Sequence, residues 1–348
     1  MGILRSTLLA LSWLAFAHGK SSRSGHAPKP YYPPTADYTD FMIPVSVAPE
    51  ALQFAFPKWE TDYDLVDFLA AATTHQNPDT QSPITGSVVG AKSKTVLLAT
   101  HGIGQARSHW NSPFRPEEYN FVQFAVDQGY SVFFYDRLGQ GSSQKIPGSG
   151  EYTEAIGKPE KLALMGFSFG SYIIHAAVAS SPEIADAVVL TAIGFNITGI
   201  YLNGLVRSFV PRIAKLQNKK YGKWDNGYLI WVDKFAQPFY DAETADFAEE
   251  AKQPFGFAEF YAFPLGNGGN YDASNFTGPA LAITGRDDYI VCDGKCDGIF
   301  DEPARTFYKN AQPFVPYLHP DASHNFNFHH NATEAYKVIT DFLAGNLK

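Results

Sequence analysis

The sequence predicts an α/β protein with a mostly parallel central sheet, helices on both faces of that sheet and an inserted helical cap. Two observations lead to this prediction. Short apolar runs rich in β-branched or aromatic residues recur along the chain, and helical or loop stretches separate most of them. Continuous apolar strands are typical of a sheet buried on both faces, and their alternation with helices favours parallel pairing. The predicted strands are 95–99, 131–135, 162–165, 187–192, 280–284 and 314–318.

The composition is that of a globular, acidic protein. The chain has 348 residues, of which 45% are hydrophobic and 18% are charged, which excludes disordered chains and disulfide-dense small proteins. Its formal net charge is −8, so we expect neither nucleic acid nor anionic lipid as a partner. Aromatic residues make up 15% of the chain, which is compatible with an apolar pocket or lid.

Residues 1–19 have the pattern of a signal peptide. They contain one cation, Arg5, followed by the apolar run 8–17 and by small residues that suit cleavage. This run is shorter than the roughly 18 residues that a membrane-spanning helix needs, and polar residues interrupt a later apolar stretch, 187–206. We therefore expect a secreted protein without stable membrane insertion. N-myristoylation at Gly2 is the alternative, because the first six residues match its loose pattern.

Two further features fit export. Asn-x-Ser/Thr sequons occur at Asn196, Asn275 and Asn331, and we expect glycosylation there. Cys292 and Cys296 are the two cysteines of the chain, and in an oxidising compartment we expect them to form a disulfide. A metal site is the alternative, but it would need distant His or carboxylate ligands, so we expect none.

After the signal peptide, we expect four segments. Residues 20–38 form an extended arm rich in Pro, Ser and Lys. Residues 39–194 and 271–348 form the two parts of one α/β core, which opens with antiparallel strands within 40–57. Residues 195–270 replace the strand and helix alternation by an aromatic-rich stretch. We interpret that stretch as a helical cap over the carboxyl edge of the sheet, the alternative being an enlarged core.

A closing helix is predicted near the C-terminus. Its apolar residues fall at i, i+3, i+4, i+7 and i+8, which places them on one stripe facing a core. These residues are Ala335, Val338, Ile339, Phe342 and Leu343.

A candidate nucleophile lies between a predicted strand and a predicted helix. The strand 162–165 runs into Gly166-Phe167-Ser168-Phe169-Gly170, and residues 171–179 have helical character. A G-x-S-x-G sequence in this context is typical of a sharp strand-to-helix turn that exposes the serine, and glycines avoid clashes where the backbone reverses. We predict that Ser168 is the nucleophile.

A serine nucleophile needs donors for the oxyanion. The strand 95–99 leads into His101-Gly102-Ile103-Gly104. We expect the backbone N–H of Ile103 to supply one donor and that of Phe169 the other. His101 precedes the nucleophile, whereas the base follows it in hydrolases with this turn, so we interpret His101 as a residue that buttresses the loop.

The acid is expected at the end of a strand that follows the nucleophile. Strand 280–284 leads into Gly285-Arg286-Asp287-Asp288, where a glycine turn would lift a carboxylate above the sheet. No carboxylate comes directly after strand 187–192. We predict Asp288 as the acid and keep Asp287 as the alternative.

The base is expected in the loop after the last strand. That loop contains His324, which would accept the serine proton while the acid fixes its tautomer. His319 lies at the strand tip, and His329 and His330 adjoin the start of the closing helix. We interpret these three as surface histidines.

Taken in this order, the motifs resemble the α/β-hydrolase superfamily, and more closely a set of secreted fungal α/β hydrolases that are serine esterases. The likeness covers most of the chain from about residue 95 onward. The resemblance implies the hydrolase fold, a triad of Ser168, Asp288 and His324, and a structural role for Asp136. It is carried by Gly-Phe-Ser-Phe-Gly at 166–170, Asp-Arg-Leu-Gly-Gln-Gly-Ser at 136–142, Thr-Gly-Arg-Asp-Asp at 284–288 and Ser-His-Asn at 323–325.

The chain departs from the family between the second and third of its core strands. The family usually places a long helix there, whereas segment 143–161 contains several glycines and prolines and only a short helical stretch. The crossover can still close, because a parallel connection needs a dozen or more residues. A genuine shortening or a misassigned splice junction would each produce this difference.

We expect a secreted serine hydrolase that cleaves a carboxylic ester, lactone or related acyl bond of an apolar small molecule through an acyl-enzyme, with no cofactor and no metal. One form of this function is the tailoring of a fungal secondary metabolite. A peptidase or thioesterase with the same triad, and a hydrolase-like binding protein without turnover, are the alternatives.

Overall fold

The computed structural model describes most of the expected core. The predicted signal peptide, Asn196 and residues 146–159 of the departing segment lie outside the described residues. The described residues are 31–34, 36–47, 56–62, 64–65, 68, 80–90, 93–145, 160–195, 211–217, 221–231, 239–257, 259 and 271–347.

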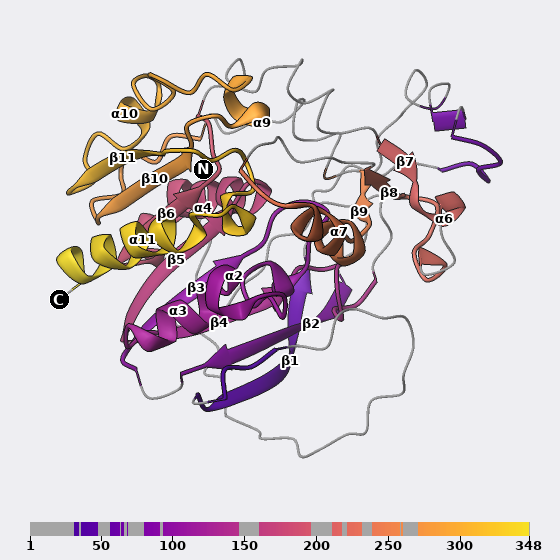
Figure 1. Ribbon diagram of the computed structural model, residues 1–348, viewed down its shortest axis with the longest axis horizontal. Helices are drawn as coiled ribbons and strands as arrows, with labels where there is room; N and C mark the ends of the chain where they lie inside the picture. Colours follow the sequence, from indigo (N-terminus) through magenta and orange to yellow (C-terminus); the bar gives the residue numbers. More distant parts are fainter. Residues whose placement is uncertain are drawn as a thin grey trace, which may run out of the picture.

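One eight-stranded sheet runs through the described core in the order β1-β2-β4-β3-β5-β6-β10-β11 (Figure 1). All neighbours from β4 to β11 are parallel, while β2 is antiparallel to both β1 and β4. The predicted mostly parallel sheet is therefore confirmed. The strands are β1 (Tyr38–Val47), β2 (Thr80–Val89), β3 (Thr95–Thr100), β4 (Ser131–Asp136), β5 (Lys161–Phe167), β6 (Ala187–Thr191), β10 (Ala280–Gly285) and β11 (Phe314–His319).

The six strands predicted from apolar runs all occur, with ends shifted by one or two residues, but β2 was missed. Its sequence contains Pro83 and Gly86, two residues that are depleted in strands. Pro83 pairs with another proline, Pro44 of β1. Gly86 leaves space for a neighbouring ring, since a Cβ there would lie 2.7 Å from the Phe133 side chain. Strand β2 thus forms because it packs against its neighbouring strands, and its own pattern of apolar and polar residues does not reveal it.

Helices cover both faces of the sheet, as predicted. On one face, α3 (Phe121–Asp127) and α11 (Ala332–Asn346) pack together over the first apolar cluster (Figure 1). On the other face, α4 (Phe169–Ser180) and α10 (Ala304–Phe307) contribute to the second cluster. The stripe predicted for the closing helix is confirmed: four of its five residues are buried in α11, and Val338 is partly buried.

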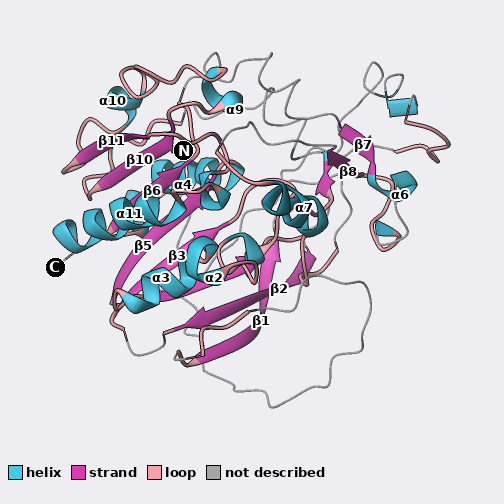
Figure 2. Ribbon diagram, in the orientation of Figure 1, coloured by secondary structure: helices cyan, strands magenta, loops and turns pink. Residues whose placement is uncertain are grey.

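The segment interpreted as a cap contains strands as well as helices. Its described helices are α6 (Ala214–Gln217) and α7 (Ala242–Ala251). A small antiparallel sheet, in the order β7-β8-β9, lies apart from the main sheet (Figure 2). The small sheet comprises β7 (Pro211–Ile213), β8 (Tyr228–Trp231) and β9 (Phe255–Gly256). Within the described ranges, no helix combines the length and the hydropathy needed to cross a bilayer.

We predict opposite effects for two Gly→Ala substitutions. At Gly170 a Cβ would lie 2.3 Å from the backbone oxygen of Thr100, so Gly170→Ala should lower the free energy of unfolding by about 2 kcal/mol or more. At Gly345, which is exposed in α11, a Cβ meets no atom within 4 Å, so Gly345→Ala should raise it by up to about 1 kcal/mol. Urea unfolding measures both, and equal effects would contradict the described approach of α4 to β3.

Candidate active site

Ser168 stands on a strained turn between β5 and α4. Its backbone has φ 51° and ψ −118°, and the left-handed region is unfavourable for a residue with a Cβ. The turn is held by a hydrogen bond of 2.9 Å from Ser168 N to the Thr191 carbonyl of β6. Gly166 permits the close approach of the two arms, because a Cβ there would lie 2.5 Å from Ser171 N. The structure therefore contains the sharp strand-to-helix turn that the sequence predicts.

His324 meets this serine from the loop that follows β11. Ser168 Oγ donates to His324 Nε2 over 2.8 Å, and the side chain of His324 is 14% exposed. The Phe167 ring lies beside the imidazole, at 5.4 Å between centroids. A largely shielded imidazole in contact with a serine hydroxyl can accept its proton when the oxygen attacks.

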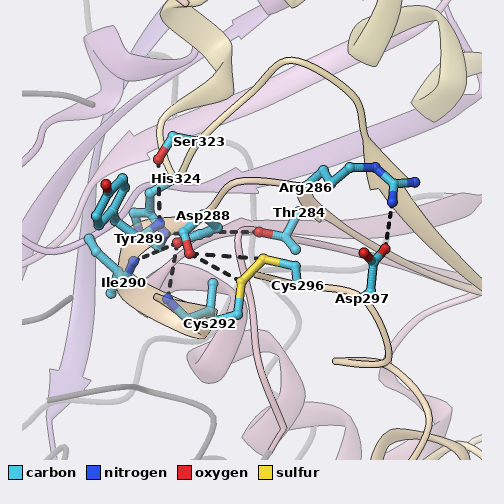
Figure 3. The surroundings of a disulfide bond; sticks show 11 residues. Thr284, Arg286, Asp288, Tyr289, Ile290, Cys292, Cys296, Asp297, Ser323 and His324 are labelled. Atoms are coloured by element: carbon cyan, nitrogen blue, oxygen red, sulfur yellow. Dashed lines mark hydrogen bonds and ion pairs between the residues drawn. A yellow bond between two sulfur atoms is a disulfide. The ribbon is translucent and has the colours of Figure 1, made fainter. Parts of the chain in front are cut away.

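Asp288, rather than Asp287, supplies the carboxylate that contacts the imidazole. His324 Nδ1 donates to Asp288 Oδ2 over 2.7 Å, and Thr284 Oγ1 donates to the same oxygen over 2.7 Å (Figure 3). The other oxygen, Oδ1, accepts from the backbone N–H groups of Ile290 and Val291 at 2.8 and 3.0 Å. The Asp288 side chain is fully buried, and these four donors replace the water that a buried carboxylate loses.

Asp287 lies next to this carboxylate but has a different environment. Its backbone N–H donates to the Ala322 carbonyl over 2.9 Å, which joins the loop after β10, with Asp288, to the loop after β11, with His324. Burial, and then the nearby negative charge of Asp321, raise the pKa of Asp287. Asp287 therefore links the two loops through its backbone.

The two cysteines brace the loop that contains Asp288. Cys292 and Cys296 are joined as a disulfide, with their Cα atoms 5.1 Å apart (Figure 3). The Asp288 carbonyl accepts from Cys292 N at 3.3 Å and from Gly294 N at 3.0 Å, and Cys296 N donates to the Arg286 carbonyl over 3.2 Å. The short loop that the disulfide closes is thus bonded directly to the backbone of Asp288.

The residues expected to form the oxyanion hole follow two adjacent strands. Thr100 of β3 pairs with Gly166 of β5, so the loop that contains Ile103 and the start of α4 at Phe169 lie at the same carboxyl edge of the sheet. His101 is fully buried in the first of these loops. Its Nε2 accepts from Arg137 N over 3.1 Å and its Nδ1 lies 2.9 Å from the Gly102 carbonyl. These contacts are those of a histidine that holds the loop.

The interpretation of three histidines as surface residues is wrong for two of them. His319 and His329 are buried, and only His330 is exposed. His329 Nδ1 accepts from Ser323 N over 3.1 Å and so holds the residue before His324. His319 Nε2 contacts the Asn331 carbonyl at 3.2 Å. Both side chains are buried by residues from distant parts of the chain. The local sequence around them therefore does not reveal their burial.

His109 is a further buried histidine near Ser168, and the sequence did not point to it. It is buried beside the Phe167 ring, at 4.2 Å between centroids, and its Nε2 meets Asn327 Nδ2 at 2.9 Å. Burial lowers the pKa of His109 and that of His329 to about 3. Both imidazoles are therefore neutral at neutral pH. No short motif surrounds His109 that would have identified it.

The predicted modification sites differ in their surroundings. Asn275 is exposed. Asn331 is partly buried, and its Nδ2 donates to the Pro320 carbonyl over 2.8 Å, a bond that glycosylation of this nitrogen would alter. In the part of the chain that the structure describes, no three His, Cys, Asp or Glu side chains are grouped so that they could hold a metal ion.

Comparison with known proteins agrees with this architecture. The model of the Alpha/beta hydrolase family matches residues 96–336. A carboxylesterase structure from the thaumarchaeon Nitrososphaera gargenis is 18% identical, with 77% of this chain and 96% of that chain covered and a TM-score of 0.51. An esterase from Pyrococcus furiosus is 14% identical, with 93% and 98% covered and a TM-score of 0.47. No curated protein matches the chain.

We predict that the two neutral histidines make the fold sensitive to acid. A histidine whose pKa falls from 6.5 unfolded to about 3 folded binds fewer protons in the folded state, so its contribution is complete above pH 6.5 and declines as the pH falls. At pH 5 each should cost about 2 kcal/mol of unfolding free energy. His329→Asn, which keeps an acceptor for Ser323 N, should flatten the dependence measured by urea unfolding between pH 7 and 5. His330→Asn is the exposed control, and an equal effect of both variants would contradict the assignment.

Proposed function

Because the chain belongs to the alpha/beta hydrolase family, we propose that it is a serine hydrolase that cleaves a carboxylic ester, lactone or related acyl bond. One observation carries the proposal. Ser168, His324 and Asp288 form a continuous chain of hydrogen bonds of 2.8 and 2.7 Å, with the serine on its strained turn. This geometry has the nucleophile, the base and the orienting acid in the order that acyl transfer requires.

The proposed reaction proceeds in two halves. Ser168 Oγ attacks the acyl carbon while His324 Nε2 takes its proton, and the carbonyl oxygen becomes an oxyanion that the N–H groups of Ile103 and Phe169 stabilise. His324 then gives the proton to the leaving alkoxide, which departs as an alcohol and leaves an acyl-enzyme. A water molecule repeats the attack, with its proton going to His324, and His324 then gives that proton to Ser168 Oγ as this oxygen leaves the acyl carbon and the acid product is released. Asp288 stabilises the imidazolium in each half.

We propose an apolar small molecule as the substrate. Phe167 and Phe169 flank the serine in the sequence, and the Ile103 side chain packs against an apolar cluster that includes Phe255 and Phe257 of the predicted cap. The net charge of −8 gives no support to nucleic acid as a partner.

We also propose that the protein is a secreted glycoprotein. The support is the signal-like residues 1–19, the cysteine pair bonded to the loop that contains Asp288 and the exposed sequon at Asn275. A tailoring reaction on a secondary metabolite would fit the same site, because it needs only an apolar ester or lactone.

Covalent labelling tests the nucleophile. A fluorophosphonate probe should modify the mature protein at Ser168, which peptide mass spectrometry would locate, and Ser168→Ala should abolish the label because no other serine is paired with His324 in this way among the described residues. Ser171→Ala is a matched control: its hydroxyl donates to the Thr191 carbonyl over 2.7 Å, away from the imidazole. A folded wild-type protein that is not labelled would favour a binding protein without turnover.

Substitution of the two neighbouring acids tests the triad. Asp288→Asn should lower kcat on p-nitrophenyl esters by about 10³- to 10⁴-fold, because the amide would hold the wrong imidazole tautomer. Asp287→Asn should stay within about threefold of the wild type, since its backbone carries the contact to the loop that contains His324. The reverse ranking would assign the acid to Asp287. Esters of graded acyl length, assayed with the wild type, would define the acyl preference.

A further inference from the structure

The backbone N–H of Ile103 is one of the two proposed oxyanion donors, and the carbonyl of Gly102, at the other end of the same peptide group, sets its direction. The Gly102 carbonyl and the Ile103 N–H belong to the same planar unit and point in opposite directions when the peptide is trans. Any group that fixes the carbonyl of Gly102 therefore also aims the N–H of Ile103. Two donors reach that oxygen: His101 Nδ1 at 2.9 Å and Arg137 Nη2 at 3.2 Å.

His101 can donate to this oxygen because it is neutral and carries its proton on Nδ1. Burial, and then the positive charge of Arg137, hold the pKa of His101 well below its usual range. Its Nε2 accepts from the backbone N–H of Arg137 at 3.1 Å, so the remaining proton lies on Nδ1 and faces the Gly102 carbonyl. Arg137 thus supports the peptide through its side chain and, by way of His101, through its backbone.

Arg137 also contacts the residue that supplies the second proposed donor. Its guanidinium carbon lies 5.0 Å from the centre of the Phe169 ring, within the range of a cation–π contact. The Arg137 side chain is only 7% exposed. One buried guanidinium therefore contacts both the Gly102 carbonyl and the Phe169 ring.

A carboxylate from the predicted cap holds that guanidinium. Glu259 Oε2 accepts from Arg137 Nη2 over 2.8 Å, and the Glu259 side chain is 12% exposed. The Gly256 N–H, 3.4 Å from Glu259 Oε1, helps to orient the carboxylate. Because both ions are largely desolvated, loss of one partner would leave the other buried and uncompensated.

Two further contacts hold the loop that contains Ile103, and they also involve residues of the predicted cap. Gln253 N donates to the Gly104 carbonyl over 2.8 Å. The Ile103 side chain packs against the cluster that contains Phe255. The loop is therefore held by its backbone, by an apolar side chain and, through Arg137, by an ion pair, and the partners in the backbone bond and the ion pair are Gln253 and Glu259 of the predicted cap.

We propose that Arg137 is a positioning residue of the oxyanion hole and that Glu259 keeps its guanidinium on the Gly102 carbonyl. Through this pair the predicted cap controls the direction of the Ile103 N–H. A charge-assisted bond to a carbonyl also polarises its peptide, which makes the N–H on the other side a better donor. The inference rests on the proposed function, because an oxyanion forms only when Ser168 attacks a carbonyl.

A second ion-pair group provides a matched control. Arg115 donates to Asp241 over 2.8 Å and to Glu243 over 2.5 Å, and so also joins the core to the predicted cap. Its side chain is 31% exposed, and its partners lie at the start of α7 instead of on the loop that contains Ile103. Arg115→Met therefore removes a core-to-cap attachment without touching the Gly102 carbonyl.

The test compares Arg137→Met, Arg137→Lys, Glu259→Gln and Arg115→Met with the wild type. The first assay measures kcat and KM on a short p-nitrophenyl ester. The second compares the affinity for an aryl trifluoromethyl ketone, whose serine adduct carries an oxyanion, with the affinity for the corresponding methyl ketone. Arg137→Met should lower kcat and trifluoromethyl ketone affinity by about 10- to 100-fold, with KM and methyl ketone affinity within about threefold. Glu259→Gln should lower kcat about tenfold. A double variant that combines Arg137→Met with Glu259→Gln should have a kcat no lower than that of Arg137→Met alone, because Glu259 acts through Arg137. Arg137→Lys should recover part of the loss, and Arg115→Met should stay within about twofold.

Three results would overturn the positioning role. They are an unchanged kcat in Arg137→Met, a loss expressed in KM alone, and an equal loss of kcat in Arg115→Met. If Arg137→Met fails to fold, Arg137→Lys and Glu259→Gln decide by the same criteria. Fluorophosphonate reactivity separates the two hypotheses: an unreactive wild-type protein refutes the proposed hydrolase, whereas a reactive wild type with an unaffected Arg137→Met refutes only the role of Arg137.

Discussion

The hydrogen bond from Ser168 Oγ to His324 Nε2 is the contact on which the rest of the site depends. It joins two residues 156 positions apart over 2.8 Å. The strands that carry them, β5 and β11, are separated in the sheet by β6 and β10. The contact therefore exists because four parallel strands keep their register and place their carboxyl ends at one edge, where open α/β sheets bind ligands.

The groups around this hydrogen bond are fixed by backbone contacts as much as by side chains. Asp288 is buried as a carboxylate because four donors satisfy it, two of them backbone N–H groups. The disulfide loop is bonded to the carbonyl of the same residue. On the other side of the serine, residues of the predicted cap hold the loop that contains Ile103. Ser168 is thus bordered by two braced loops, and stabilisation of an oxyanion demands preorganisation of this kind.

The sequence was sufficient for those features that local patterns encode. Six strands were predictable because they are continuously apolar, and the hydrogen-bonded set of Ser168, His324 and Asp288 was predictable because each residue follows a strand end in a recognisable turn. The strand β2 was not predictable, since Pro83 and Gly86 are explained only by the neighbouring strands. The burial of His329 depends on rings such as Tyr240, stacked 6.2 Å away. Arg137 stood within a known motif, but its contact with Glu259 joins residues 122 positions apart.

The most direct test of this account is the structure of the covalent phosphonate adduct of the protein. The account predicts a bond between phosphorus and Ser168 Oγ, with the phosphoryl oxygen about 2.7–3.1 Å from the backbone nitrogens of Ile103 and Phe169. Phosphorus bonded to another residue, or a phosphoryl oxygen that faces solvent with both nitrogens out of reach, would contradict it.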